Sequence, residues 1–466
     1  MDGAKKQRMN IMSHRDHSIS QITTGTIWKQ LLFFFFPIVL GTFFQQFYNT
    51  IDAIVVGRFV GKTALASVGG SAGQIINLFV GFFTGLTAGA SVIISQFFGA
   101  QNASGVSKSI HTAYAFSIIG SIVITIGGVL LTPTMLRMMN TPSELMPESI
   151  IYLRIYFGGI LCVFIYNIGS SILRAVGDSK RPLYYLIICC IVNIILDLIM
   201  VVVFRLGVAG VAIATLISQA ISALLVTRAL MSSTGLLHLS LKRICLHKSM
   251  LKAQLRIGLP GGIQTAMYSI SNIIIQAALN NFGTDTTAAW AAYGKLDAIF
   301  WMISGAFGIA ITTFVGQNYG AGKYERVKKS VRTCLWMDAF ISVVLIVFLM
   351  VACTPLFHIF TTDAHVVAIG AHMLKMITPC YIFFIFIEVL AGALRGMGDV
   401  LIPTLITMCG ICLLRIVWVA VLTPLRPEIS TIIFSYPVTW IVAAVLFILY
   451  YVYRIRRMPP GAQKNA

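Results

Sequence analysis

Residues 45–52 read Gln-Gln-Phe-Tyr-Asn-Thr-Ile-Asp and lie inside the first long apolar segment of the chain. A charged side chain at the centre of a membrane helix costs about 2.5–3.5 kcal/mol on insertion scales, so an acid there indicates a functional site. One helical face collects the polar side chains of this segment, since three- and four-residue spacings separate Thr42, Gln45, Asn49 and Asp52. The sequence therefore predicts a membrane helix with a polar stripe that ends at Asp52.

The composition extends this reading to the whole chain. The 466 residues are 58% hydrophobic and only 11% charged, whereas a soluble domain carries about 25% charged residues. The sequence thus predicts an all-α polytopic membrane protein. The net charge of +19 is then a signal of topology and of contact with anionic lipid, and we expect no nucleic-acid partner.

The apolar segments can be counted, because a spanning helix needs about 20 mostly apolar residues. Several segments exceed this length and must tilt, bend or protrude. Twelve transmembrane helices are predicted, at residues 28–58, 63–98, 106–132, 147–173, 182–204, 207–229, 254–281, 285–317, 331–353, 364–394, 400–422 and 430–453.

Lysine and arginine set the orientation of these helices. With the N-terminus inside, 25 of the 34 basic residues fall at inner ends or in inner loops and six at outer ends. Cytoplasmic loops carry such an excess. We therefore expect a multi-pass protein of the cell (plasma) membrane with both termini in the cytoplasm and the lipid bilayer as its surroundings.

An internal repeat divides the chain. Residues 95–100 resemble 316–321, and 173–178 resemble 394–399, both at an offset of 221 residues. An even number of spans per half places the symmetry axis along the membrane normal, the arrangement of alternating-access transporters. We expect two six-helix bundles related by a pseudo-twofold, within these bounds: an N-terminal cytoplasmic arm, 1–26; an N-lobe, 27–229; a cytoplasmic linker, 230–253; a C-lobe, 254–455; and a cytoplasmic tail, 456–466.

Polar groups of three N-lobe helices fall at similar depths. Asp52 is six residues before the outer Arg58, Asp197 is eight before the outer Arg205, and Thr215 is ten after it. With a rise of 1.5 Å per residue, they lie roughly 9, 12 and 15 Å below the outer ends. The three side chains are therefore expected to meet in the outer half of the N-lobe.

Asn193 completes this set, because it shares a helical face with Asp197 at a spacing of four residues. Two carboxylates, a carboxamide and a hydroxyl suit Na⁺ or a shared proton, since two neighbouring acids in a low dielectric do not both ionise easily. The predicted coupling site is thus Asp52, Asn193, Asp197 and Thr215, with Na⁺ as a possible metal. In the alternative reading, Asn193 and Thr215 only tie helices together.

The C-lobe lacks this set. At the repeat offset, Asn193, Asp197 and Thr215 correspond to Leu414, Trp418 and Tyr436. It carries other charges near aromatic and methionine side chains, which suit a lipophilic cation. We assign a substrate cleft to Gln45, Tyr268, Asp297, Glu388 and Arg415. The alternative is a structural ion pair of Glu388 or Asp297 with Arg415 or Lys295.

The repeated Leu-Arg-x-x-Gly-Asp turns at residues 173–178 and 394–399 are interpreted as structural or as gate hinges, since glycine permits a tight turn and the charges can cap helix ends. The sequence contains no phosphate-binding loop, catalytic triad or metal cluster. We therefore expect a protein that is not an enzyme and has no cofactor other than its coupling ion.

Several motifs together resemble the multidrug and toxic compound extrusion (MATE) family. They are Asn49-x-x-Asp52-x-x-x-Val56-Gly57, the paired Leu-Arg-x-x-Gly-Asp turns, and Gly-Gln-Asn-Tyr-Gly-Ala-Gly at residues 316–322. The resemblance implies two bundles in a V around a central cleft and cation-coupled drug antiport. It places the coupling site on the residues chosen above, together with Asn49, and adds Tyr152. One branch of the family relies on a glutamate in helix seven, and residues 254–281 contain no acid.

The predicted function is a cation-coupled (H⁺ or Na⁺) antiporter that exports small organic, often cationic and amphipathic, compounds as a monomer. The alternative is a flippase for lipid-linked saccharides, although that function favours more cationic residues than Lys295 and Arg415 at mid-membrane. A channel or a membrane-embedded enzyme is a third class, which the repeat and the missing catalytic set disfavour. The sequence does not identify the substrates or the coupling ion.

Overall fold

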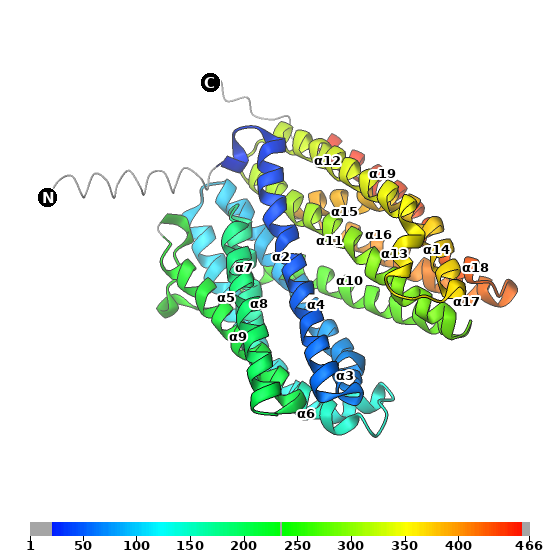
Figure 1. Ribbon diagram of the computed structural model, residues 1–466. Helices are drawn as coiled ribbons and strands as arrows, with labels where there is room; N and C mark the ends of the chain where they lie inside the picture. Colours follow the sequence, from blue (N-terminus) through cyan, green and yellow to red (C-terminus); the bar gives the residue numbers. More distant parts are fainter. Residues whose placement is uncertain (1–20, 234, 459–466) are drawn as a thin grey trace. The chain divides into compact units, whose positions relative to one another are not determined.

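The computed structural model describes residues 21–233 and 235–458, and these residues form helices and turns with no β-strand (Figure 1). The predicted N-terminal arm up to residue 20 and the tail from residue 459 lie outside the described residues. The helices are α2 Ile27–Val55, α3 Lys62–Ser67, α4 Gly73–Gly99, α5 Ala103–Met138, α6 Met146–Gly158, α7 Ile160–Ala175, α8 Lys180–Leu198, α9 Gly207–Met231, α10 Lys248–Asn280, α11 Thr284–Gly320, α12 Tyr324–Val351, α13 Cys353–His358, α14 Ala364–Ile377, α15 Tyr381–Gly396, α16 Leu401–Thr407, α17 Leu414–Leu425, α18 Ile429–Ile433 and α19 Ser435–Arg456.

Ten helical segments of the described residues are long and apolar enough to cross a membrane, and an eleventh span is the bent pair α6 and α7. The 33-residue helix α10 covers the remaining predicted span, 254–281, with a more polar composition. The predicted span 147–173 corresponds to this pair, and the chain bends by 50° between α6 and α7. The glycine pair at Gly159 explains the bend, since the side chain of Leu216 fills the space where a Cβ would lie.

Two compact units make up the chain, and we describe each by itself. The first unit is Phe36–Gly262; the second comprises the residues up to Phe35 and those from Ile263 on. Both boundaries fall inside continuous helices, next to Pro37 in α2 and Pro260 in α10. The predicted lobe bounds 27–229 and 254–455 stay a prediction.

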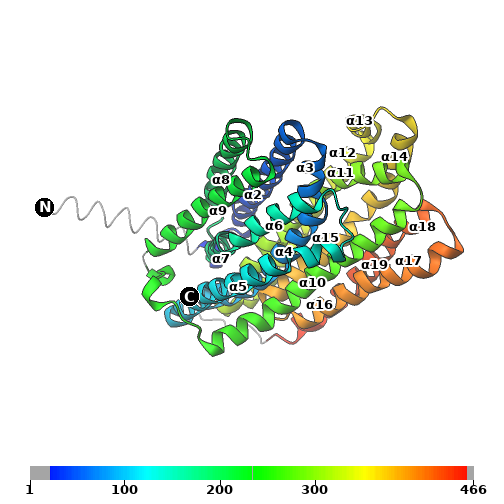
Figure 2. The ribbon, with the colours of Figure 1, turned by 90° about the horizontal axis from the view of Figure 1, so that it is seen from below.

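Close backbone packing holds the start of α10 against α4 in the first unit (Figure 2). A Cβ at Gly85 would meet the backbone of Gly262, and a Cβ at Gly89 would meet the backbone at Gln254 and Gly258. Glycine is required where two helix backbones approach this closely. The amide of Gln254 also donates to the carbonyl of Ser109 at 2.9 Å, which ties α10 to α5.

The internal repeat is visible in the local conformation of the chain. After α7, the N–H of Asp178 donates to the carbonyl of Leu173 at 2.9 Å, and after α15, that of Asp399 donates to Leu394 at 3.0 Å. The glycine before each aspartate has a positive φ, 96° at Gly177 and 84° at Gly398. Both turns thus end their helices with the same left-handed C-terminal motif, which supports the structural reading of these sequences.

A buried histidine fixes the linker between the two halves of the sequence to α5. His111 is 3% exposed. Its Nε2 accepts from the backbone N–H of Ser240 at 3.1 Å, and its Nδ1 lies 2.7 Å from the carbonyl of Ser107. Because an amide N–H can only donate, the ring is neutral with its proton on Nδ1, donated to Ser107. Nearby, the backbone N–H of His247 donates to Thr112 Oγ1 at 3.2 Å.

We expect His111→Phe to release this linker, because phenylalanine cannot accept from Ser240. The exposed trypsin sites of the linker include Lys242 and Arg243, and limited proteolysis of the protein in detergent measures the accessibility of these two. Cleavage there is expected to become at least several-fold faster. His238→Asn, an equal loss of an imidazole at an exposed linker position, is the control. Equal cleavage rates in the His111 variant and the wild type would show that the imidazole does not hold the linker.

Candidate functional site: a buried polar cluster

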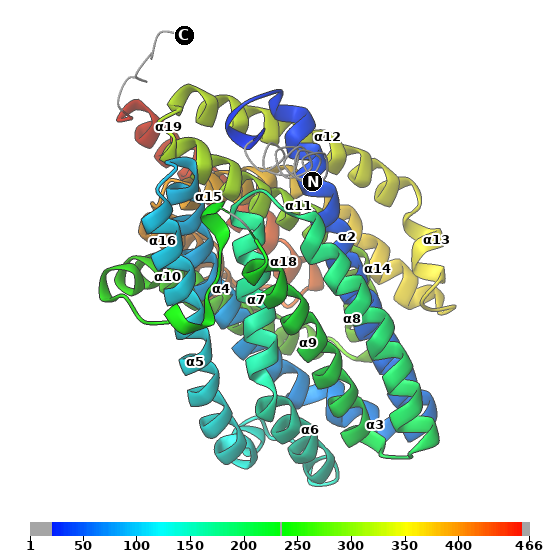
Figure 3. The same cartoon turned by 90° about the vertical axis from the view of Figure 1, so that its left-hand side faces the viewer.

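The first unit contains a cluster of buried polar side chains where α2, α8 and α9 meet. Helices α8 and α9 lie side by side (Figure 3) and are joined by a short turn in which Arg205 and Gly207 both have positive φ values, 54° and 56°. This tight connection makes the two helices antiparallel, so residues equally far from the turn lie at equal depth. Asn193 and Asp197 of α8 are fully buried, and Thr215 of α9 is 7% exposed.

Departures from α-helical geometry lie close to both carboxylates. Helix α2 continues as a π-helical turn at Val56–Val60, four residues after Asp52, and α8 continues as one at Ile199–Val203, two residues after Asp197. The two π-helical turns contact one another. Such turns are often found at functional sites, because they redirect side chains and leave backbone groups free of regular pairing.

The polar atoms of this cluster lack protein partners. Apart from the contact between the two carboxyl groups, several of its buried atoms have no hydrogen-bond partner among the described residues: Asp52 Oδ1, Asn193 Oδ1 and Nδ2, Asp197 Oδ1 and Oδ2, and Thr215 Oγ1. An unsatisfied buried polar group costs about 1–3 kcal/mol, and more when it is charged. The Asp52 and Asp197 carboxyl groups interact with one another, while no lysine or arginine of the described chain forms an ion pair with either.

This donor set fits a small hard cation or a proton. It offers carboxylate, amide and hydroxyl oxygens, which hard cations prefer, and a carboxyl pair can share a proton. Among residues 21–233 and 235–458, no group of three histidine, cysteine, aspartate or glutamate side chains has the arrangement of a metal site. The cluster is therefore chemically suited to Na⁺ or H⁺ and not to a transition metal.

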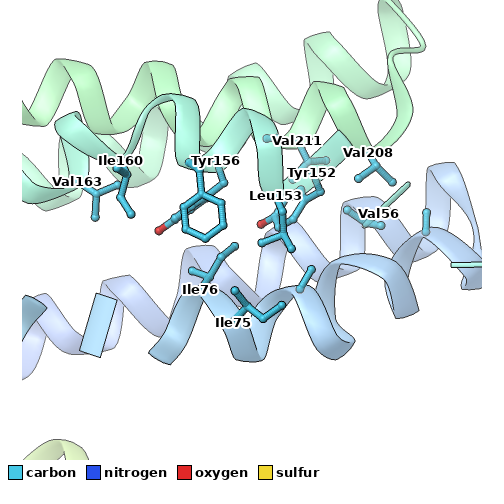
Figure 4. Close-up of a cluster of buried hydrophobic side chains, with 14 of the residues drawn as sticks. Val56, Ile75, Ile76, Tyr152, Leu153, Tyr156, Ile160, Val163, Val208 and Val211 are labelled. Atoms are coloured by element: carbon cyan, nitrogen blue, oxygen red, sulfur yellow. The ribbon is translucent and has the colours of Figure 1, made fainter. Parts of the chain in front are cut away.

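Tyrosines surround the two acids. Tyr152 and Tyr156 of α6, each 8% exposed, lie in a cluster of buried apolar side chains (Figure 4). Tyr152 interacts electrostatically with Asp52 and Asp197. The sequence reading missed Tyr48, which is 7% exposed and lies one turn before Asp52, with which it also interacts. The sequence did contain a signal for this contact, since Tyr48 and Asp52 are four residues apart and so lie on the same face of the helix.

Two residues of the predicted polar stripe lie outside the buried cluster. The side chains of Gln45 and Asn49 are exposed, whereas Thr42 is half-buried and its hydroxyl donates to the carbonyl of Ile38 at 3.1 Å. The assignments of Asn49 to the coupling site and of Gln45 to the substrate cleft thus stay predictions. The exposure of both side chains does not support them.

The charged residues predicted for the second half lie together in the second unit. Asp297 Oδ1 accepts from the hydroxyls of Tyr381 at 2.5 Å and Tyr293 at 3.2 Å, and its Oδ2 accepts from Trp301 Nε1 at 2.7 Å. Tyr268 of α10 interacts electrostatically with both Glu388 and Arg415. The structure therefore brings the acids, Arg415 and Tyr268 into one region.

The pairing of these charges differs from the alternative predicted above. Glu388 forms its ion pair with Arg395, at 3.1 Å, seven residues later on α15. Within the described residues, no ion pair includes Arg415 or Lys295. The prediction of an ion pair with Arg415 or Lys295 was therefore wrong, because Arg395 lies on the same helix as Glu388 and the Asp297 oxygens accept from neutral donors instead.

Comparison with known proteins shows where this fold recurs. The family model MatE matches residues 37–199 and 260–421. The probable multidrug resistance protein YoeA of Bacillus subtilis is 29% identical over 435 residues, or 91% of this chain and 94% of the relative. YpnP, another probable multidrug resistance protein of this organism, is 30% identical over 394 residues, covering 84% and 88%. A solved structure of a MOP superfamily transporter from Pyrococcus furiosus has a TM-score of 0.88 at 21% identity and covers 94% of this chain and 98% of its own.

If the cluster is unsatisfied in the empty protein, removing one polar atom should stabilise it. Thr215→Val has nearly the same shape and eliminates an unpartnered buried hydroxyl, so we expect the unfolding free energy to rise by about 1 kcal/mol. Thermal unfolding in detergent measures this change. Thr112→Val is the control, because Thr112 Oγ1 accepts from His247, and it should lower the stability. A less stable Thr215 variant would mean that this hydroxyl is satisfied after all.

Proposed function

Because the chain belongs to the MatE family, whose members are transporters and not enzymes, we propose that it is a secondary active antiporter in which inward movement of H⁺ or Na⁺ drives the export of small organic compounds. Its fold is accordingly all-α, with twelve transmembrane helices in two six-helix bundles. The relatives named above support the broad activity, multidrug efflux across a membrane.

The observation that carries the coupling proposal is the set of unpartnered buried oxygens at Asp52, Asn193, Asp197 and Thr215. A buried carboxyl pair with no cationic partner is destabilising until a proton or a cation joins it. The unpaired carboxyl groups thus destabilise the empty protein, and binding of an ion relieves this destabilisation. The cluster also draws its members from three helices, so that its occupancy affects how α2 packs against α8 and α9.

Loading of this site would change the conformation of α2. Neutralising Asp52 removes the repulsion between the two carboxyl groups and permits α2 to repack and bend near Pro37, where the helix lacks one backbone donor. A ligand shifts a conformational equilibrium only by its difference in affinity for the two states. We propose that the loaded conformation binds the exported compound more weakly, which couples ion entry to substrate release.

The exported compounds are proposed to be organic, often cationic and amphipathic, and the protein to act as a monomer in the cell membrane with cytoplasmic termini. The flippase alternative needs several cationic side chains to hold a pyrophosphate. In the second unit, Lys295 and Arg415 are the mid-membrane candidates, and the acids Asp297, Glu388 and Asp338 outnumber them. This charge balance favours antiport of organic compounds.

We expect Asp52→Asn to abolish coupled efflux, because a carboxamide can neither take up a proton nor balance the charge of Na⁺. The measurement is substrate efflux from proteoliposomes, with a pH gradient and a sodium gradient imposed in separate experiments. The gradient that drives efflux in the wild type identifies the coupling ion. We expect the rate of coupled efflux to fall at least 100-fold, because losing a charge interaction costs roughly 3 kcal/mol.

Asp338→Asn is the control, since Asp338 is a fully buried acid of the second unit whose carboxylate accepts from Ser304 at 3.4 Å and from Ser342 at 3.1 Å, whereas Asp52 is half-buried. It should retain the response to the gradient. Gradient-driven export by the Asp52 variant at the wild-type rate would sink the proposal, provided that both variants reach the vesicles in equal amounts.

A further inference from the structure

A buried arginine in the second unit has no carboxylate partner. Arg415 of α17 is 3% exposed. Its one hydrogen bond among residues 21–233 and 235–458 runs from Nη2 to the hydroxyl of Thr439, at 3.2 Å, and its buried Nε has no acceptor. An unpaired charge in a membrane helix is costly and marks a functional site with a missing partner.

An acid that interacts with Arg415, Asp297, does not pair with it. Asp297 interacts electrostatically with Arg415, yet no ion pair joins the two side chains. The Asp297 oxygens already accept from three donors, the hydroxyls of Tyr293 and Tyr381 and the indole N–H of Trp301. Asp297 is therefore held by its own set of donors, and the guanidinium remains available.

One face of the buried guanidinium is stacked on an aromatic ring, and its edge has an N–H donor, at Nε, without an acceptor. The ring of Tyr436 lies against it, with its centroid 3.8 Å from the guanidinium carbon. Such stacking covers the flat face of the group, whereas its N–H donors point outward in the guanidinium plane. Those donors form a fork that matches the two oxygens of a carboxylate or phosphate.

The tyrosine that stacks on Arg415 belongs to a group of packed aromatic side chains from three helices. Tyr436 packs against Trp290 at 5.8 Å and against Trp440 at 5.6 Å, and Trp440 packs against Tyr381 at 6.0 Å. Trp290 belongs to α11, Tyr381 to α15, and the other two to α19. Ring faces and edges of this kind accommodate a flat aromatic ligand. Of this group, Trp290 is the half-buried member, and Trp301, on the same helix, is exposed.

The backbone next to Arg415 is also irregular. A π-helical turn, Met408–Leu413, ends two residues before it. The extra residue of a π-turn shifts the direction of the following side chains and is often found at functional sites. In the first unit, Asp197 has the same kind of neighbour on its other side, at Ile199–Val203.

We propose that Arg415 is the anchor of a substrate site for aromatic compounds that carry an oxyanion, a carboxylate or a phosphate. The oxyanion binds the free N–H edge of the guanidinium, and the ring system packs among Trp290, Tyr436 and Trp440. This inference rests on the proposed transport function and names a substrate class for it. It adds anionic compounds to the cationic ones expected from the sequence.

The test uses the purified full-length protein in detergent and calorimetric titration with 2-naphthoate and 2-naphthyl phosphate. Neutral methyl 2-naphthoate is the matched probe without charge. The wild type is expected to bind at least one anionic probe more tightly than the ester. Arg415→Gln should weaken that binding by about tenfold or more, the effect of a lost charge-assisted hydrogen bond, and leave the ester unchanged. Which anion binds distinguishes the carboxylate from the phosphate.

Two further variants keep the test decisive. Lys295→Gln removes an exposed charge from α11 and should not change binding of the anions. Arg415→Lys retains the charge that the fold accommodates but loses the planar fork, so it should bind the anion more weakly than the wild type even if Arg415→Gln does not fold. The proposed site would be refuted if the folded Arg415 variants bound the anionic probes as tightly as the wild type. It would also be refuted if the wild type bound 2-naphthoate and 2-naphthyl phosphate no more tightly than the neutral ester.

The Asp52→Asn variant separates this inference from the proposed function. It should still bind the anionic probe, because Asp52 lies in the other unit, while its coupled efflux is lost. Anion binding that depends on Arg415 together with undiminished efflux by the Asp52 variant would refute the coupling proposal alone. Loss of coupled efflux in the Asp52 variant together with anion binding that ignores Arg415 would refute the substrate site alone.

Discussion

Two neighbouring carboxyl groups, one on the fully buried Asp197 and one on the half-buried Asp52, constrain the first unit because no cation balances them. Asp52 and Asp197 come from helices far apart in the sequence, and each has buried oxygens without a donor. Such a pair is unfavourable in a low dielectric, so the surrounding helices must be held together by other contacts. The apolar cluster that includes Leu153, Phe157 and Val211 supplies packing of this kind beside the acids.

The backbone around the acids serves the same end. Glycines allow α10 to approach α4 until their backbones touch, and such contact stabilises membrane helices without any help from a hydrophobic driving force. The acids themselves lie next to π-helical turns, where the regular hydrogen-bond ladder is already interrupted. The first unit thus contains both close helix packing and a locally irregular polar site, a combination that suits an ion-driven change of helix packing.

Much of this arrangement could be predicted from sequence because helical geometry converts residue counts into depth. The level of Asp52, Asp197 and Thr215 followed from a fixed rise per residue and from the basic residues at helix ends. In the structure Asp52 interacts with Asp197 and Thr215 is buried, while their role as a coupling site stays a prediction. The two halves were visible because the turns after α7 and α15 need glycine at the same repeat position. Membership of the MatE family confirms the resemblance drawn from those motifs.

Other features depended on tertiary packing and could not be read in advance. The glycine pair at Gly158 and Gly159 permits the bend, but the sequence does not show that Leu216 packs where a Cβ of Gly159 would lie. Gln45 and Asn49 share a helical face with Asp52 by spacing, yet neighbouring helices cover only part of that face. The sequence also did not show which cation pairs with Glu388. Arg395 lies seven residues later on α15, but basic residues on other helices were equally plausible partners.

The two units differ in which buried charged groups lack a partner. In the first, the carboxyl groups lack donors, an arrangement that suits the proposed binding of a cation or proton. In the second, Asp297 has three donors and the guanidinium of Arg415 lacks an acceptor, so an incoming anion completes the site. Because the local turns repeat while these polar side chains do not, the repeat maintains the scaffold and the differences between the halves carry the ligand chemistry. A duplicated fold of this kind can hold a driving ion in one half and part of a substrate in the other without either site competing for the same charge.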